Sequence, residues 1–140
     1  MKFLIHRNSP KCLNYRIFKE ELIFEQYLSK LPLKLALELC KYRTCNMNLP
    51  IEKGRWINIP RNERLCQLCN VSEIGDEFHY LFTCQDSTII YYRNCLIPRY
   101  YYIFPNTYKF NKLFNSQNKK LLLKLSKFIC IIKERVNSPG

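Results

Sequence analysis

The sequence predicts a mostly α fold: a small helical domain in which amphipathic helices flank a central knuckle of cysteine and histidine. Three observations lead to this prediction. Apolar residues recur at helical spacing in the segments before and after the centre of the chain. Proline and glycine punctuate the connections between these segments. Four potential metal ligands lie together in the middle of the chain, at Cys66, Cys69, His79 and Cys84.

The segments before the knuckle are predicted to form two amphipathic helices, over residues 12–31 and 32–45. Pro32 separates them and can occupy the first turn of the second helix. In that second helix Leu39 and Tyr42 share an apolar face, which predicts that they pack in a core.

The central segment is predicted to contain little regular structure before its histidine. Residues 46–60 carry several breakers and are expected to be irregular, with a short strand at 55–59. Residues 61–70 form the predicted knuckle turn. A helix is expected to begin with Asp76 as its N-cap and to end near Thr83.

Two further helices are predicted after the knuckle, over residues 87–97 and 118–136, with Pro98 ending the first. Residues 99–108 are rich in tyrosine and proline and are expected to form a loop. The last helix has an apolar stripe and a basic stripe on opposite faces. The apolar stripe consists of Leu121, Leu125, Phe128 and Ile132, and the basic stripe of Lys120, Lys124 and Lys127.

The four central ligands have spacing typical of a metal site. Cys66 and Cys69 can direct two sulfurs at one ion from a tight turn, and His79 and Cys84 can complete the set. Three cysteines and one histidine form a standard tetrahedral zinc set that leaves no position open for a substrate. The pattern therefore predicts structural Zn2+ and a Cys3His zinc knuckle.

Two other readings of the cysteines remain open, as buried thiols or as a disulfide framework, because the chain has eight of them. The apolar run at residues 3–5 is too short for a signal peptide, so an intracellular, nuclear or cytoplasmic, non-secreted protein is expected. Clustered cysteine and histidine in a reducing compartment favour metal. The remaining cysteines have no paired spacing: Cys12, Cys40, Cys45, Cys95 and Cys130.

The formal net charge of +12 is concentrated in the last third of the chain. From Pro98 onward, nine lysines and arginines face one acid, Glu134, which gives +8 of the +12. Such a surface favours a polyanion, by attraction and by counterion release. A solvated lysine-rich helix face is the alternative, with acidic lipid headgroups as a weaker one. No apolar run is long enough to span a membrane, so no membrane partner is expected.

The sequence lacks the residues that common catalytic sites require. The two aspartates of the chain, Asp76 and Asp86, do not form the carboxylate cluster of a polymerase. The three glycines are too far apart for a phosphate-binding loop. Zinc deaminases have a His-x-Glu motif before a Cys-x-x-Cys motif, whereas here the Cys-x-x-Cys motif comes before the histidine. We therefore expect no catalysis and no small-molecule substrate.

Several runs of sequence, spread over residues 8–135, resemble one known family. The most specific lie between residues 54 and 84, and the flanking helices match less specifically. The matching runs include KYRT at 41–44, LPIEKGRW at 49–56, IPRNERLC at 59–66, EIGDEFHYLFTC at 73–84 and FNKL at 110–113. They resemble the C-terminal zinc-binding region of non-LTR (LINE-type) retrotransposon reverse transcriptases.

The resemblance implies that the chain binds template RNA or target DNA and follows an upstream polymerase domain. Met47, where the family would have histidine, departs from the pattern, and the endonuclease and polymerase parts are missing. The predicted nucleic-acid contacts are Arg43, Arg55, Arg61 and Arg64 at basic positions of the family, Trp56 as a stacking residue, and Lys120, Lys124 and Lys127.

The predicted organisation has four parts. They are an N-terminal extension at 1–10, a helical flank and connecting loop at 11–60, the zinc-binding knuckle with its following helix at 61–98, and a basic helical tail at 99–140. A zinc-stabilised protein-interaction module, packed on a missing polymerase domain, is the competing functional hypothesis. In that case the charge of the tail would serve only solvation.

Overall fold

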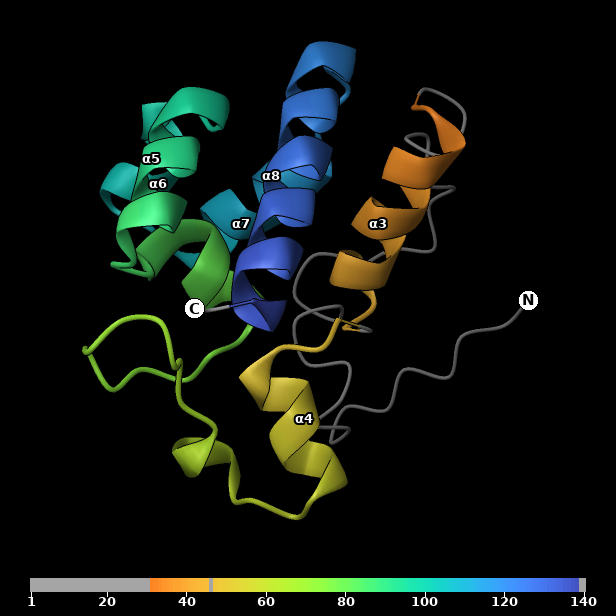
Figure 1. Ribbon diagram of the computed structural model, residues 1–140. Helices are drawn as coiled ribbons and strands as arrows, with labels where there is room; N and C mark the ends of the chain where they lie inside the picture. The colour runs from red at the N-terminus through yellow and green to blue at the C-terminus, as the bar shows by residue number, and fades with distance from the viewer. Residues whose placement is uncertain (1–30, 46, 139–140) are drawn as a thin grey trace.

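The computed structural model describes residues 31–45 and 47–138, and these are mostly helical, which confirms the predicted fold class (Figure 1). The predicted helix at 12–31 lies almost wholly outside the described residues. In chain order the elements are α3 (Leu33–Arg43), α4 (Pro50–Trp56), the 3-10 turn η1 (Arg61–Glu63), the π-helical turn η2 (His79–Thr83), α5 (Ser87–Leu96), α6 (Arg99–Ile103), α7 (Thr107–Phe114) and α8 (Lys119–Asn137).

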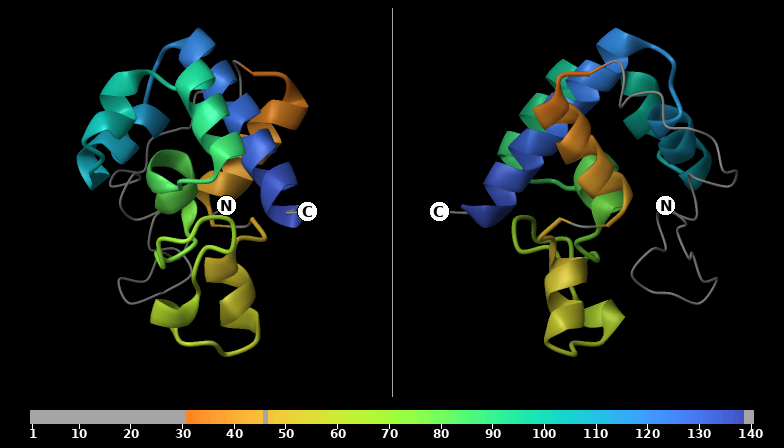
Figure 2. Two further views of the ribbon diagram at one scale, coloured as in Figure 1. Left: turned by 60° about the vertical axis from the view of Figure 1, so that its left-hand side comes forward. Right: turned by 90° about the vertical axis from the view of Figure 1, so that its right-hand side faces the viewer.

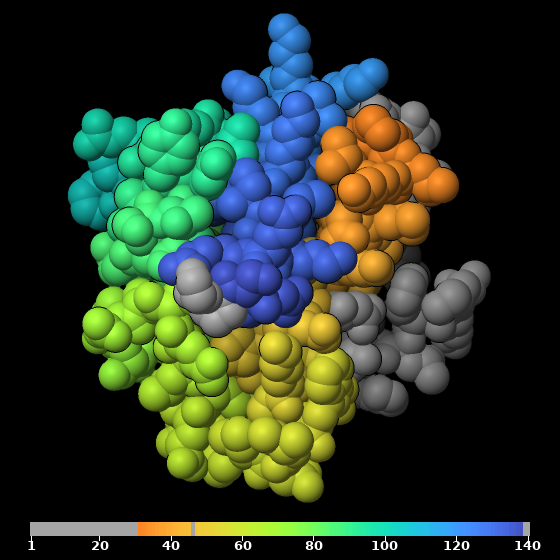
Figure 3. All heavy atoms as spheres, in the orientation of Figure 1, coloured from red at the N-terminus to blue at the C-terminus, as the bar shows by residue number. Residues whose placement is uncertain are grey.

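The long helix α8 organises the arrangement of the others. It packs against α3 on one side and α5 on the other, so these three helices form one layer (Figures 1 and 3). Helices α6 and α7 lie behind this layer, whereas α4 and η1 extend from one end of it (Figure 2). The N-terminal end of α8 is therefore at the opposite end of the molecule from α4.

The core follows from the apolar face of α8. Its N-terminus is capped by Asn118, whose side chain accepts a hydrogen bond of 3.2 Å from the Leu121 amide. From the predicted stripe, Leu125, Phe128 and Ile132 are fully buried, and Leu121 is half-buried at the edge. They share one core with residues from α3, α5 and α7, including Leu39, Tyr42, Ile89, Phe110 and Phe114.

Ion pairs fasten the C-terminal half of α8 to both neighbouring helices. Lys133 lies 3.1 Å from Glu38 of α3. Arg135 makes two hydrogen bonds, of 3.0 and 3.1 Å, to the carboxylate of Asp86, which also caps α5 by accepting from the Ile89 amide. Both carboxylates are nearly buried. The two parallel hydrogen bonds between Arg135 and Asp86 stabilise the fold more than an exposed ion pair would.

The predicted strand at 55–59 is wrong, because helix α4 occupies Pro50–Trp56. Pro50 stands at the start of this helix, where a proline loses no hydrogen bond, so it begins a helix instead of breaking one. Glu52 in the first turn suits the positive end of the helix dipole. The apparent alternation at 55–59 was too short to outweigh these signals.

The predicted loop at 99–108 is also wrong, because α6 fills Arg99–Ile103 and α7 begins at Thr107. Pro98 is the residue before α6 and thus starts a helix as well as following one. Asn106 caps α7 by accepting a hydrogen bond of 2.8 Å from the Lys109 amide. Of the tyrosines in this segment, Tyr101 is buried in the core, whereas Tyr100 and Tyr108 are exposed.

Gly54 lies inside α4 because the side chain of Arg64 passes over it. Arg64 donates to the carbonyl of Ile59 at 2.8 Å and to that of Ile51 at 3.1 Å, which fixes its position. A Cβ atom at position 54 would lie 2.5 Å from the Arg64 Cγ atom. This glycine is therefore required by the close approach of a side chain, against helix propensity.

We predict that Gly54→Ala lowers the free energy of unfolding by about 1–3 kcal/mol through overpacking, although propensity alone would raise it by about 1 kcal/mol. Urea unfolding followed by circular dichroism measures the change. In an Arg64→Ala background the same substitution should be neutral or stabilising, because the clash has gone. Destabilisation of equal size in both backgrounds would contradict this explanation.

Candidate metal centre

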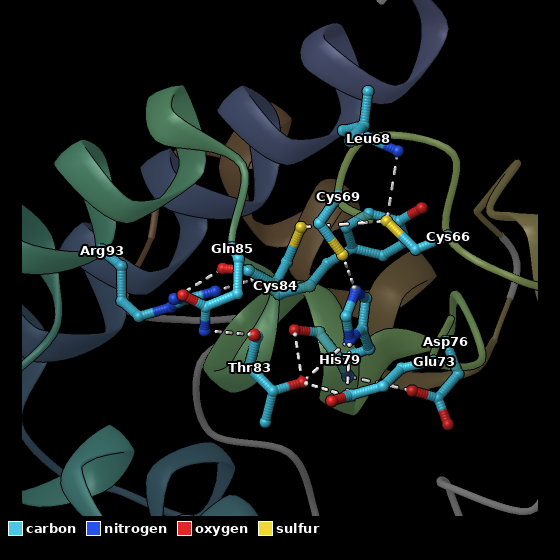
Figure 4. A network of polar contacts seen from close by, with 11 residues as sticks. Cys66, Leu68, Cys69, Glu73, Asp76, His79, Thr83, Cys84, Gln85 and Arg93 are labelled. Carbon is cyan, nitrogen blue, oxygen red and sulfur yellow. Dashed lines mark hydrogen bonds and ion pairs between the residues drawn. The ribbon is translucent and has the colours of Figure 1, made fainter. Parts of the chain in front are cut away.

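The four predicted ligands meet at one point, although they come from separate parts of the sequence. The donor atoms of Cys66, Cys69, His79 and Cys84 all lie within 4.8 Å of one another, and all four residues are buried. Cys66 and Cys69 come from the loop that follows η1, His79 begins η2, and Cys84 directly follows η2. Figure 4 shows their side chains pointing toward one another. This group could hold a metal ion.

Two of the distances between donor atoms are close to those around a tetrahedral ion. With typical metal–sulfur and metal–nitrogen bonds, tetrahedral angles require about 3.8 Å between two sulfurs and about 3.6 Å between sulfur and nitrogen. The sulfurs of Cys66 and Cys84 are 3.8 Å apart, and the sulfur of Cys69 is 3.4 Å from His79 Nε2. A disulfide needs about 2.05 Å. The geometry therefore favours a shared ion over a disulfide between Cys66 and Cys84.

Backbone hydrogen bonds shape the loop that presents Cys66 and Cys69. Residues Leu65 and Ile74 form an isolated antiparallel bridge, and the Cys66 amide donates to the Glu73 carbonyl at 2.9 Å. Within the loop the Leu68 amide points at the Cys66 sulfur, at 3.4 Å. An amide directed at sulfur favours its thiolate form, which is the form that binds metal.

The second half of the site depends on a widened helical turn. Asp76 caps its start as predicted, accepting a hydrogen bond of 2.9 Å from the His79 amide. The Cys84 amide then donates to the His79 carbonyl at 2.7 Å, a spacing of five residues that defines a π turn. In an α-helix, residues five apart would differ in direction by about 140°. The π turn brings His79 and Cys84 to the same side.

The other nitrogen of His79 is held by two side chains. His79 Nδ1 lies 2.8 Å from the hydroxyl of Thr83 and 3.1 Å from the carboxylate of Glu73 (Figure 4). Because Nε2 faces the sulfurs, the proton belongs on Nδ1, where it donates to these oxygens. This outer contact fixes the ring orientation that a metal ligand needs and makes Nε2 more basic.

Arg93 of α5 fixes the chain around Cys84 from the opposite side. Its buried guanidinium donates to three carbonyls, those of Tyr80 at 3.0 Å, Leu81 at 2.8 Å and Cys84 at 3.0 Å. These carbonyls belong to the end of η2, where the backbone acceptors have no helical partner. Burial lowers the pKa of Arg93, and the nearby charge of Cys84 opposes that effect.

The ligands compete for protons in a way that suits a cation. A hydrogen bond from Cys84 lowers the pKa of the Cys66 thiol to about 3, and the same contact raises the pKa of Cys84. Burial acts to lower the pKa of His79, but hydrogen bonds and charges from Cys66 and Cys69 outweigh it and raise this pKa to about 9. Cys66 therefore carries the thiolate while Cys84 and His79 hold their protons more tightly, and a divalent ion would have to displace those protons on binding.

The predicted nucleic-acid residues are not gathered into one patch. Lys120, Lys124 and Lys127 are exposed along the first half of α8, at the opposite end of the molecule from α4. Arg55 and Trp56 end α4, and both donate to the Glu52 carboxylate, Trp56 at 3.1 Å. The indole of Trp56 is otherwise exposed, at 56%.

The remaining three predicted arginines have contacts inside the protein. Arg43 is 3% exposed and donates to the Phe114 carbonyl and the Asn115 side chain at the end of α7, both at 3.1 Å. Arg64 is held over Gly54. Arg61 lies 3.8 Å from the carboxylate of Asp76, beside the start of the turn that carries His79. Arg64 thus fastens α4 to the residues that follow η1, and Arg61 pairs with the residue that caps the turn carrying His79.

Sequence reasoning missed the residues that support the ligands. Thr83 could have been found, because it lies four residues after His79 and so shares its helix face. Glu73 is in a loop, and only the folded chain brings it to His79. Nothing in the sequence connects Arg93 to carbonyls 9 to 13 residues earlier.

Comparisons with protein families, with curated proteins and with solved structures found no match to this chain. The resemblance to retrotransposon reverse transcriptases therefore stays a prediction. Within the residues that the structure describes, no helix combines the length and apolar character needed to cross a bilayer.

We predict that Glu73→Gln lowers affinity for Co2+ by about 10-fold, because outer-sphere partners of a histidine ligand contribute 10–100-fold and Glu73 is half exposed. Competition with a chromophoric chelator measures this affinity. Glu63→Gln, a change of the same charge at an exposed position of η1, should leave the affinity unchanged. Equal effects of the two substitutions would show that Glu73 acts only through general charge.

Proposed function

We propose that the chain is a zinc-stabilised nucleic-acid-binding module, similar to the C-terminal domain of a retrotransposon reverse transcriptase and without its polymerase active site. The metal organises the fold, and the exposed cations of α8 bind the phosphates of RNA or DNA. The observation that carries the binding proposal is the row of exposed lysines on the first half of α8, which has no acidic partner among the described residues.

Zn2+ is the ion that the donor set favours. Thiolates and imidazole in a tetrahedral arrangement suit zinc, whereas magnesium and calcium require oxygen ligands. Four protein ligands fill the coordination sphere, so we assign the ion a structural role. Three thiolates around Zn2+ give a net charge of about −1. The buried guanidinium of Arg93 lies beside Cys84 and offsets this charge.

The two halves of α8 differ in how their cations are satisfied. Lys133 and Arg135, in the last turns, pair with Glu38 and Asp86. In the described part of the chain, no carboxylate lies within ion-pair distance of the cations in the first half, which are Lys119, Lys120, Lys124 and Lys127. The sequence between Ser87 and Lys133 contains no aspartate or glutamate at all. This surface is available for a polyanion.

The proposed contact surface excludes some predicted residues. Arg43 is buried, and Arg64 is held by backbone carbonyls, so neither belongs to it. Arg55 and Arg61 each have a carboxylate partner, which reduces their attraction for phosphate. Trp56 keeps an exposed face and is a secondary candidate for stacking.

A protein-interaction module, docked on a polymerase domain, is the second candidate. It is favoured by Leu33 and Leu37, which are four residues apart on α3 and 75% and 48% exposed. Neighbouring exposed leucines on one helix face are typical of a surface that another protein covers. Binding of this kind would be insensitive to salt, unlike binding of phosphates.

We predict that the purified chain carries one zinc ion and that Cys84→Ser loses it, because three ligands hold the ion less tightly than four. Native mass spectrometry gives the stoichiometry. Removal of the ion by a chelator should also lower the thermal midpoint, since metal binding and folding are coupled. Cys95→Ser, at an exposed position of α5, is the control and should retain zinc. Full occupancy in Cys84→Ser would rule out this centre.

For nucleic acid, we predict that Lys120→Gln/Lys124→Gln/Lys127→Gln weakens binding of single-stranded RNA. The slope of log affinity against log salt should fall in magnitude by about 2, because each phosphate contact contributes about 0.7. Fluorescence anisotropy at several salt concentrations measures this slope.

The control for this experiment is Lys41→Gln/Lys53→Gln, which removes exposed lysines of α3 and α4. Its slope should change by less than about 1. If the salt slope falls by the same amount per lysine in both variants, α8 is not the contact surface. Absence of RNA binding by the unchanged protein would favour the interaction module.

A further inference from the structure

Helices α6 and α7 carry exposed aromatic rings next to cations, on a part of the molecule that the proposed function has not used. Phe104, which follows α6, is 76% exposed, and Tyr108 in the first turn of α7 is 67% exposed. Only Pro105, Asn106 and Thr107 separate them in the chain. Large aromatic side chains normally bury most of their surface, so two such rings beside one short connection call for an explanation.

Two lysines of α7 are fixed beside a third aromatic ring. The ammonium groups of Lys109 and Lys112 lie 4.6 and 5.0 Å from the centre of the Tyr100 ring. They are one helical turn apart and thus reach the same ring from α7. Tyr100 of α6 is itself 47% exposed. The cation–π contacts hold the ammonium groups near the surface without neutralising their charge.

No carboxylate competes for these cations in the described residues. The sequence from Ser87 to Lys133 has no acid, and neither Lys109 nor Lys112 has an ion pair within the described ranges. A protein partner with an apolar surface would have to desolvate both ammonium groups, at considerable cost. A phosphate backbone would be attracted by them, and the bases beside it could stack on the exposed rings.

We propose that the surface formed by Tyr100, Phe104, Tyr108, Lys109 and Lys112, here called the aromatic platform, binds single-stranded nucleic acid by base stacking. The proposal rests on the proposed function, and it specifies which form of nucleic acid the module prefers. Stacking requires unpaired bases, because in a duplex the faces of the bases are already covered by their neighbours. Lys109 and Lys112 bind the phosphates, and Phe104 and Tyr108 receive the bases.

Helix α7, which carries part of the platform, directly precedes the basic helix α8 in the chain. Helix α7 ends at Phe114 and α8 begins at Lys119, so Lys112 and the first lysines of α8 lie on either side of one short connection. Helices α6 and α7 lie behind α8 in Figure 1 and come to the side in Figure 2.

The test compares three probes of equal length, about 12 nucleotides, with the intact chain: an oligothymidylate, a strand of the same backbone without bases, and a duplex. The variant is Phe104→Ala/Tyr108→Ala, which keeps the charge. Its affinity for oligothymidylate should fall about 5- to 150-fold for each stacked base that is lost. Its affinity for the baseless strand and the duplex should not change, nor should its salt slope.

The control is Tyr91→Ala/Tyr92→Ala, which removes two exposed aromatic rings from α5 and should leave all three affinities unchanged. If the unchanged protein binds the baseless strand as tightly as oligothymidylate, or if Phe104→Ala/Tyr108→Ala weakens all probes equally, the platform is wrong and nucleic-acid binding stands. If the unchanged protein binds none of the probes, the proposed function itself fails, and the platform with it.

Discussion

The convergence of three sulfurs and one imidazole is the constraint on which the rest of the structure depends. It joins a loop with little regular structure to a helical turn that starts ten residues later. Neither part would hold its shape alone, because the loop has one β bridge and the turn has an unusual hydrogen-bond pattern. An ion shared by these four ligands would tie both parts to one centre, and ion binding would then be coupled to folding.

The contacts around the ligands extend this constraint into the helical layer. Arg93 of α5 donates to carbonyls of the residues after His79, which joins the cluster to α5. Asp86, the cap of α5, accepts from Arg135, which joins α5 to α8. Phe82, in the turn between His79 and Cys84, packs edge-on against Phe110 of α7, with ring centres 5.8 Å apart. The Cys3His cluster and the basic helix are thus parts of one packed unit.

Charge divides the surface into two kinds of region. Around the metal centre and along the last turns of α8, the cations have carboxylate or carbonyl partners and contribute to the fold. Along the first half of α8 and on α6 and α7, the chain has cations but no acids, so the charge has no partner within these elements. Long lysine side chains cost little there as long as solvent surrounds them, and a polyanion gains by displacing counterions.

The sequence by itself determined the mostly helical fold class, the four residues of the Cys3His cluster, the cap at Asp76 and the face of α8 that enters the core. These depend on spacing along the chain, and helical periodicity and metal-ligand spacing are local properties. It failed at α4 and α6, where prolines read as breakers in fact begin helices.

Only the tertiary structure decided what each arginine and lysine does. Arg43, Arg64 and Arg93 look in the sequence like any surface cations, yet each donates to backbone carbonyls, Arg43 and Arg93 in the interior and Arg64 at a half-buried position. The reason is that a guanidinium satisfies carbonyls wherever the fold leaves them unpaired, and those positions depend on contacts between distant segments. The same contacts decided that Phe104 and Tyr108 stay at the surface while Phe110 and Phe114 enter the core.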